Sequence, residues 1–190
     1  MSTADTDWSL ARQVREGRDT AFDELMHRHS RPVIRFIYRM IGNAGEAEDV
    51  AQDVFVRAYR AMCKPSFKEG PGQFSTWLFQ VARNAAIDWL RRRKSRPAES
   101  LSGLQDEGAQ FPGPGRTADQ EVIGDETARA VATAVAALPD AQREVLILSE
   151  YHGLSCGEAA EVLNASEKSV ETRLYRARQT LRDRLRNLLG

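Results

Sequence analysis

The chain has little of what secreted proteins and membrane proteins depend on. It contains two cysteines, Cys63 and Cys156, which lie far apart and outside any C-x-x-C pair. We therefore expect two inert packing thiols, and neither a disulfide framework nor a cysteine zinc site. No apolar run approaches the ~18 residues of a membrane-spanning helix, which predicts no membrane insertion. The N-terminus carries acids and no apolar core, unlike a signal peptide, so we expect a cytoplasmic protein.

Residue sets for catalysis are also missing. Only three histidines are present: His27 and His29 diverge on a helix, and His152 comes at a predicted helix end. No Ser/His/Asp set, phosphate-binding loop or metal-ligand spacing appears. The sequence predicts no catalytic residue, no cofactor and no metal, and hence a protein that is not an enzyme.

Net charge is absent as well, but the charge is segregated along the chain. Bases and acids number 27 each, yet residues 1–96 carry a net +5, residues 97–126 a net −6 and residues 127–190 a net +1. A neutral total therefore does not exclude a nucleic-acid partner. Residues 97–118 are rich in Pro, Gly and acids and show no period, which predicts a flexible acidic linker between domains 1–96 and 119–190. The alternative, a long surface loop in one domain, is less common in compact folds.

The flanking segments have helical periodicity and no sustained alternation, so the fold class predicted is all-α. Pro32 sits well in a first turn, which favours separate helices over 19–29 and 32–41. Ser75 or Thr76 is expected to cap a helix that continues past Trp89, and Pro139 to start another. The remaining helices are predicted at 7–16, 45–62, 125–138, 155–163 and 167–189.

The last two of these segments have the pattern of a helix-turn-helix. Asn164 occupies the turn, where a positive φ is expected, and Ser166 is placed to cap the second helix. The start of that helix is polar and basic, as in helices that read base edges in the major groove. Its candidate base-reading residues are Lys168, Ser169, Glu171, Thr172 and Arg173, with Arg176 directed to phosphate. The alternative is a plain amphipathic hairpin with a solvated basic face.

A second basic region ends the first domain. Amide and carboxylate side chains can read unpaired nucleobases while neighbouring basic side chains bind phosphate. The candidate residues are Gln80, Arg83, Asn84, Asp88, Arg91 and Arg92, with Phe67 and Lys68 from the preceding loop. Trp77 and Trp89 are expected to pack inward, whereas Phe67 is equally suited to core packing and to base stacking.

A third surface is acidic. Glu48, Asp49, Gln52 and Asp53 form one face of the predicted 45–62 helix. Acids near a helix start favour the helix dipole, and the same face is suited to docking a basic protein surface. Spacing alone does not separate the two interpretations.

Three runs in order, AGEAEDVAQDVFVRAYRAM, FSTWLFQVARNAAIDWLRRRKSR and LPDAQREVLILSEYHGLSCGEAAEVLNASEKSVETRLYRARQTLR, resemble bacterial extracytoplasmic-function sigma factors. The resemblance covers nearly the whole chain outside the 97–118 segment. It implies two helical domains that bind core RNA polymerase and recognise promoter elements near −10 and −35. It also makes an anti-sigma protein an expected partner.

The resemblance assigns a role to each surface. Asp49, Gln52 and Asp53 match the helix that docks on the polymerase clamp; Asn84 and Asp88, with the loop around Phe67 and Lys68, match the part that opens and reads the −10 strand. Lys168, Ser169, Glu171, Thr172, Arg173 and Arg176 match the −35 reading helix, where duplex DNA is bound. The alternative from another class is a stand-alone helix-turn-helix regulator whose N-terminal domain senses a ligand or dimerises.

Overall fold

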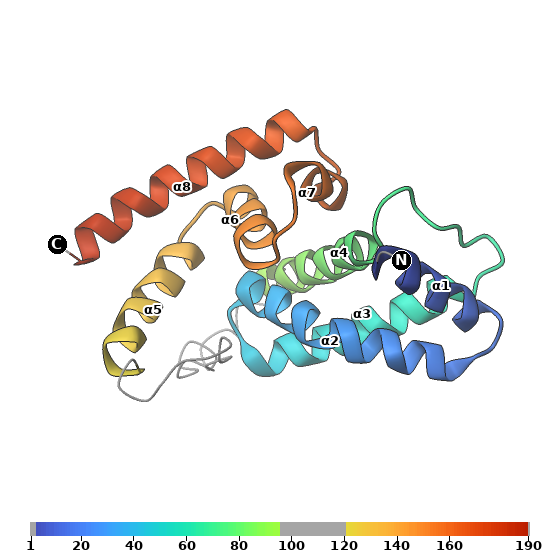
Figure 1. The fold of residues 1–190 in the computed structure, drawn as a ribbon. Helices are drawn as coiled ribbons and strands as arrows, with labels where there is room; N and C mark the ends of the chain where they lie inside the picture. Colours follow the sequence, from blue (N-terminus) through green and yellow to red (C-terminus); the bar gives the residue numbers. More distant parts are fainter. Residues whose placement is uncertain (1–2, 96–120, 190) are drawn as a thin grey trace.

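A computed structural model describes the backbone of residues 3–95 and 121–189, and the side chains of residues 6–95 and 127–186. Within these ranges the chain is helical and has no strand, which confirms the predicted all-α class (Figure 1). The predicted linker, 97–118, lies outside the described residues. The elements are α1 (Thr3–Arg15), α2 (Asp19–Ile41), α3 (Ala44–Met62), α4 (Phe74–Ser95), α5 (Glu121–Ala136), α6 (Asp140–Leu146), the π-helical turn η3 (Ile147–Tyr151), α7 (Cys156–Leu163) and α8 (Glu167–Leu189).

Helices α1 to α4 form the N-terminal half. Each presents a stripe of apolar residues inward, and side chains such as Phe36, Val54 and Ala82 are fully buried between α2, α3 and α4. Helix α1 closes the end of this bundle, where the Trp8 indole Nε1 donates to the Gly72 carbonyl at 2.8 Å. The loop between α3 and α4 is thus fastened to α1.

Helix α2 corrects one prediction. The expected break between residues 19–29 and 32–41 is wrong, because α2 runs unbroken from Asp19 to Ile41 with Pro32 inside it. Proline removes one backbone donor from a helix interior. The apolar stripe nevertheless continues through it, from Leu25 to Val33 and Ile37, all 1% exposed or less. Burial on both sides of the proline offsets the lost hydrogen bond.

The start of α4 also differs from the expectation. The helix begins at Phe74, before both predicted caps. Phe74 is 2% exposed and Thr76 is 4% exposed, so both side chains belong to the core. Tertiary packing of Phe74 against the Trp8 ring, with ring centroids 5.3 Å apart, draws the first turn inward.

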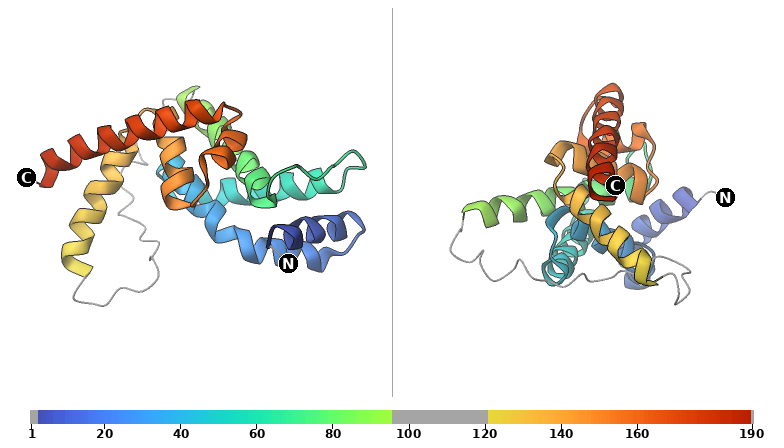
Figure 2. Two further views of the ribbon diagram at one scale, coloured as in Figure 1. Left: turned by 45° about the horizontal axis from the view of Figure 1, so that its top comes forward. Right: turned by 90° about the vertical axis from the view of Figure 1, so that its left-hand side faces the viewer.

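The C-terminal half contains the predicted helix-turn-helix. Ser155 caps α7 in a reciprocal capping box with Glu158. Asn164 adopts φ 49°, as expected for the turn, and the Ser166 hydroxyl accepts from the Ser169 backbone N–H at 3.3 Å, which confirms the predicted cap. These local bonds fix α8 relative to α7, and Figure 2 shows α8 as a long rod along the outside of the molecule.

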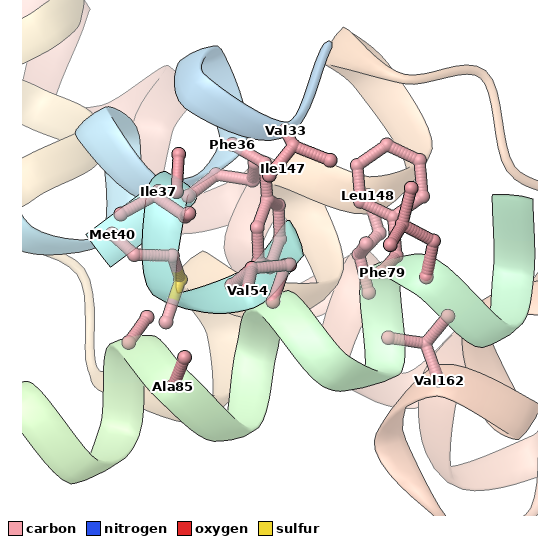
Figure 3. Close-up of a cluster of buried hydrophobic side chains, with 14 of the residues drawn as sticks. Val33, Phe36, Ile37, Met40, Val54, Phe79, Ala85, Ile147, Leu148 and Val162 are labelled. Carbon is pink, nitrogen blue, oxygen red and sulfur yellow. The ribbon is translucent and has the colours of Figure 1, made fainter. Parts of the chain in front are cut away.

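The two halves pack against each other through apolar side chains. Ile147 and Leu148 of η3 are fully buried and lie with Val33 and Phe36 of α2 and Phe79 of α4 (Figure 3). Helix α7 adds Val162 to the same cluster. The structure is therefore a closed arrangement in which the helix-turn-helix half sits on α2 and α4.

Candidate nucleic-acid and polymerase-docking surfaces

The first surface is the N-terminal part of α8. Val170 and Ala177 are fully buried and Leu174 is 6% exposed, so this stripe anchors the helix. The opposite side holds the six predicted base- or phosphate-contacting residues. Lys168, Glu171, Thr172 and Arg176 are exposed, and Ser169 and Arg173 are half-buried. The predicted reading face is therefore open to a partner in the closed arrangement.

Two side chains of α8 form hydrogen bonds within the protein. The Thr172 hydroxyl donates to the Lys168 carbonyl at 2.9 Å, which directs it toward its own helix. Arg178 donates from Nε to Glu150 Oε1 at 2.9 Å, so its guanidinium is held beside the preceding helices of its own half. Tyr175 is 65% exposed on the reading helix and was not among the predicted residues. The signal available in the sequence was an aromatic residue between two predicted contact positions, Arg173 and Arg176.

The second surface is on α4, and its predicted residues do not all share one face. Asn84 is exposed, with Gln80 and Asp88 one turn to either side of it. Arg91 and Arg92 are exposed at the end of the helix. Arg83 instead points to the C-terminal half.

Around this helix the expected interior tryptophans are partly buried. Trp77 lies against Phe67 with centroids 5.3 Å apart. Trp89 donates from Nε1 to Glu46 Oε2 at 2.9 Å and lies under the Arg93 guanidinium. Both rings therefore tie α4 to its neighbours.

The loop before α4 is organised by α1. Phe67 is half-buried, and its ring contacts Trp8 and Trp77. Its carbonyl accepts from Arg15 at 3.4 Å, while Arg12 and Glu69 form an ion pair at 2.6 Å. Lys68 is exposed beside them. Phe67 is therefore packed against two tryptophans and is still partly exposed.

The third surface is the acidic face of α3. Asn43 caps the helix by accepting from the Glu46 backbone N–H at 2.9 Å. Glu48, Asp49 and Gln52 are exposed, and Val54 is buried on the opposite side. The four predicted residues therefore form one contiguous surface on the first half of the helix. Val56, 46% exposed, extends this surface by one turn and was not predicted.

Arg57 connects the acidic face to α4. It lies 2.6 Å from Asp53 on its own helix and 3.5 Å from Asp88 on α4. The Asp53 hydrogen bond is the main cause that raises the pKa of Arg57 above its ordinary value. The predicted docking surface and the predicted −10 surface thus share one cation.

No group of three or more His, Cys, Asp or Glu side chains in the described part is arranged to hold a metal ion. Among the described helices, none is both long and apolar enough to span a bilayer. The described residues offer three surfaces suited to binding: the exposed polar face of α8, the amide and carboxylate face of α4 beside basic residues, and the acidic face of α3.

Comparison with known proteins identifies the family of this chain. Residues 25–96 match the family model for sigma-70 region 2, and residues 128–181 match that for sigma-70 region 4. The ECF RNA polymerase sigma factor SigW of Bacillus subtilis is 33% identical over 93% of this chain and 95% of its own. The ECF RNA polymerase sigma-E factor of Escherichia coli is 29% identical over 100% and 99%.

Two solved structures share the fold. CnrH in complex with the cytosolic domain of CnrY superposes with TM-score 0.69 at 31% identity, over 95% of this chain and 97% of CnrH. The sigma factor RpoE of Bartonella quintana, in complex with the anti-sigma factor NepR, gives TM-score 0.68 at 23% identity, over 87% and 96%. The chain belongs to the extracytoplasmic-function (ECF) family of RNA polymerase sigma factors and is an alternative sigma factor that acts in transcription initiation.

Proposed function

We propose that this protein binds core RNA polymerase through the acidic face of α3 and recognises a promoter with two separate helices. The observation that carries the proposal is the open polar face of α8 in a half that matches sigma-70 region 4. We divide the chain into a polymerase-binding and −10-reading domain at 1–96, a linker at 97–118 and a −35-reading domain at 119–190. The protein acts by binding and carries out no bond chemistry of its own.

The −35 element is read as duplex DNA by the start of α8. Lys168 and Arg173 can donate hydrogen bonds to the guanine acceptors O6 and N7. The Glu171 carboxylate can accept one from the cytosine amino group. Arg176 follows one turn later and suits phosphate. The buried stripe below these residues supports the proposal because it holds the helix at a fixed angle.

The −10 element is bound as an unpaired strand on α4. Asn84, Gln80 and Asp88 offer hydrogen-bonding groups to base edges, and Arg91 and Arg92 offer charge to phosphate. Lys68 and the partly exposed Phe67 extend this path on the loop. Capture of unstacked bases would stabilise the melted promoter and so favour initiation.

Core polymerase docks on Glu48, Asp49, Gln52 and Asp53, a surface suited to a basic partner. The two structural neighbours were solved with a partner protein, CnrY for CnrH and the anti-sigma factor NepR for RpoE. We infer that this protein likewise has an anti-sigma partner. Since it acts on polymerase, its place of action is the cytoplasm.

A run-off transcription assay tests the function. Purified protein and core polymerase are given a library of fragments from the host genome, and we expect discrete transcripts that need both proteins. Gel shifts with the recovered fragments should then be strong only when core polymerase is present. Absence of transcripts from every fragment, or tight specific binding without polymerase, would overturn the proposal.

A further inference from the structure

One basic residue that is predicted to contact DNA is paired with a carboxylate of the protein itself. Arg83 donates from Nε to Glu144 Oε2 at 2.9 Å, and the two side chains are only 22% and 8% exposed. Glu144 belongs to α6, in the C-terminal half. A carboxylate is expensive to bury unless it is paired and hydrogen-bonded. The closed arrangement therefore makes a specific bond to a cation of the −10 helix.

Further carboxylates of the C-terminal half lie along the same helix and its preceding loop. Glu158 Oε1 accepts from Gln73 Nε2 at 2.8 Å. Glu161 lies over Gly72, where a Cβ atom would come within 2.5 Å of its Oε2. The acids Asp140 and Glu144 line a cleft together with Arg91 and Lys94 of α4. We call Asp140, Glu144, Glu158 and Glu161 the acidic row.

Apolar contacts hold the acidic row in position. The His152 ring lies between Phe36 and Phe79, with centroids 5.8 and 4.8 Å away. The Arg39 guanidinium stands 4.0 Å over the Tyr151 ring. Together with the buried Ile147 and Leu148 of η3, these contacts form the interface between the two halves (Figure 3).

The closed arrangement is too small to read a promoter. Sites near −10 and −35 are about 25 base pairs apart, or about 85 Å of duplex at ~3.4 Å per base pair. A compact chain of 190 residues has a radius of gyration of about 16 Å. One closed molecule therefore cannot place α4 and α8 on both elements, and the halves must separate first.

We propose that the acidic row is an intramolecular mimic of the DNA backbone: Glu144 occupies Arg83 of α4 in the free protein, the other acids of the row lie over the end of α4 and its preceding loop, and the row must be displaced before the −10 strand is bound. Asn84 stays exposed, so the contact withholds phosphate-binding charge while the base-reading amide stays free. The proposal rests on the −10 role assigned to α4 above. It predicts that the free protein has little affinity for DNA despite its two basic surfaces.

The test compares single-strand binding and compactness in the full-length protein without polymerase. The probe is a fluorescein-labelled mixed-sequence oligodeoxynucleotide of about 20 nucleotides, chosen because stacking and backbone contacts tolerate sequence. Glu144→Gln should tighten binding about fivefold or more and raise the radius of gyration in small-angle scattering. Glu161→Gln, on the exposed side of α7, should shift both readouts in the same direction and keeps the test valid if Glu144→Gln unfolds.

Glu150→Gln is the matched control. It makes the same change in charge and shape, but Glu150 pairs with Arg178 inside the C-terminal half. We expect less than a twofold change in affinity and no expansion. Equal tightening by Glu144→Gln and Glu150→Gln would reveal a mere net-charge effect and overturn the mimic.

The experiment distinguishes a failure of the proposed −10 role from a failure of the proposed mimic. If no variant binds the oligonucleotide, both the −10 role and the mimic are overturned. If the unchanged protein binds tightly and Glu144→Gln and Glu161→Gln leave affinity and size unaltered, the mimic alone is overturned.

Discussion

Asn84 and Arg83 are neighbours in the sequence with opposite surroundings. Asn84 stands open to solvent on α4, while Arg83 is bound to Glu144 across the interface between the halves. One residue step along a helix turns a side chain by about 100°. In the proposed mechanism, these two adjacent polar residues serve different states of the protein: Asn84 serves the DNA complex and Arg83 the closed form.

Replacing Asn84 by Ala should weaken binding of the −10 single strand about 5- to 30-fold, since one base-reading amide contact contributes about 1–2 kcal/mol. Binding of a −35 duplex should not change, and the free energy of unfolding should move by less than about 0.5 kcal/mol because the side chain is exposed. Fluorescence anisotropy with both probes measures this. Gln52→Ala removes the same amide from α3 and should leave both DNA affinities intact; equal losses for the two variants would refute the role of Asn84.

His152 links the closed form to pH. Burial and the nearby Arg39 and Arg35 lower the pKa of His152 from 6.5 to about 4. When the halves separate, the ring meets water and its pKa returns toward 6.5. The open form thus binds a proton that the closed form excludes, so closure is fully favoured above pH 6.5 and weakens as the pH falls from 6.5 toward 4.

At about pH 5.5, protonation of His152 in the open form should disfavour closure by about 1.4 kcal/mol, which lowers the equilibrium constant for closing about tenfold. Small-angle scattering should therefore show a larger radius of gyration at pH 5.5 than at pH 7.5. His152→Phe keeps an aromatic ring between Phe36 and Phe79 but cannot titrate. The radius of gyration of this variant should therefore be the same at both pH values. A His152→Phe protein that expands to the same extent would assign the response to other groups.

Residue-level predictions succeeded where the chemistry is local. The positive φ of Asn164 and the capping role of Ser166 depend on backbone geometry within a few residues, and both are confirmed. The partner of Arg83 was out of reach because Glu144 lies 61 residues away. His152 was placed only at a helix end, since its aromatic surroundings come from two other helices.

At the scale of elements, periodicity located most helices, and the errors lie where packing overrides local preference. Ser75 and Thr76 are good capping residues, yet α4 begins at Phe74 because that ring is buried against Trp8. Pro32 favoured a helix start, yet α2 continues through it because its apolar stripe is buried on both sides. Burial of a stripe is a property of the assembled bundle, and a single segment does not reveal it.

Pro32→Ala should stabilise the protein. Alanine restores the backbone donor to the Arg28 carbonyl and has a far higher helix propensity, partly offset by the freer unfolded chain. We expect the free energy of unfolding in urea to rise by about 1–2 kcal/mol. Ser30→Ala, two residues earlier in α2, changes only propensity and should alter it by less than about 0.5 kcal/mol; a loss of stability in Pro32→Ala would contradict this account.

At the scale of the molecule, the balance of charge has a structural counterpart. Basic residues of the two predicted DNA-facing helices are paired with acids of other elements, as in Arg83 with Glu144 and Arg178 with Glu150. Pairs of this kind reduce the charge available to phosphate. We expect a protein arranged in this way to depend on a partner that separates its halves, and the acidic face of α3 is the surface that we propose for that partner.

Reversing the charge of that surface is the sharpest test of the partner. Asp49→Lys should weaken association with core polymerase at least about tenfold, because a like charge then meets the basic surface expected there, and run-off transcription should fall in parallel. Asp23→Lys makes the same reversal on an exposed position of α2 and should leave association unchanged. Association is measured by surface-immobilised core polymerase at two salt concentrations, where the loss should shrink as salt screens the repulsion. If both variants bind alike, the acids of α3 serve the helix dipole, and polymerase docks elsewhere.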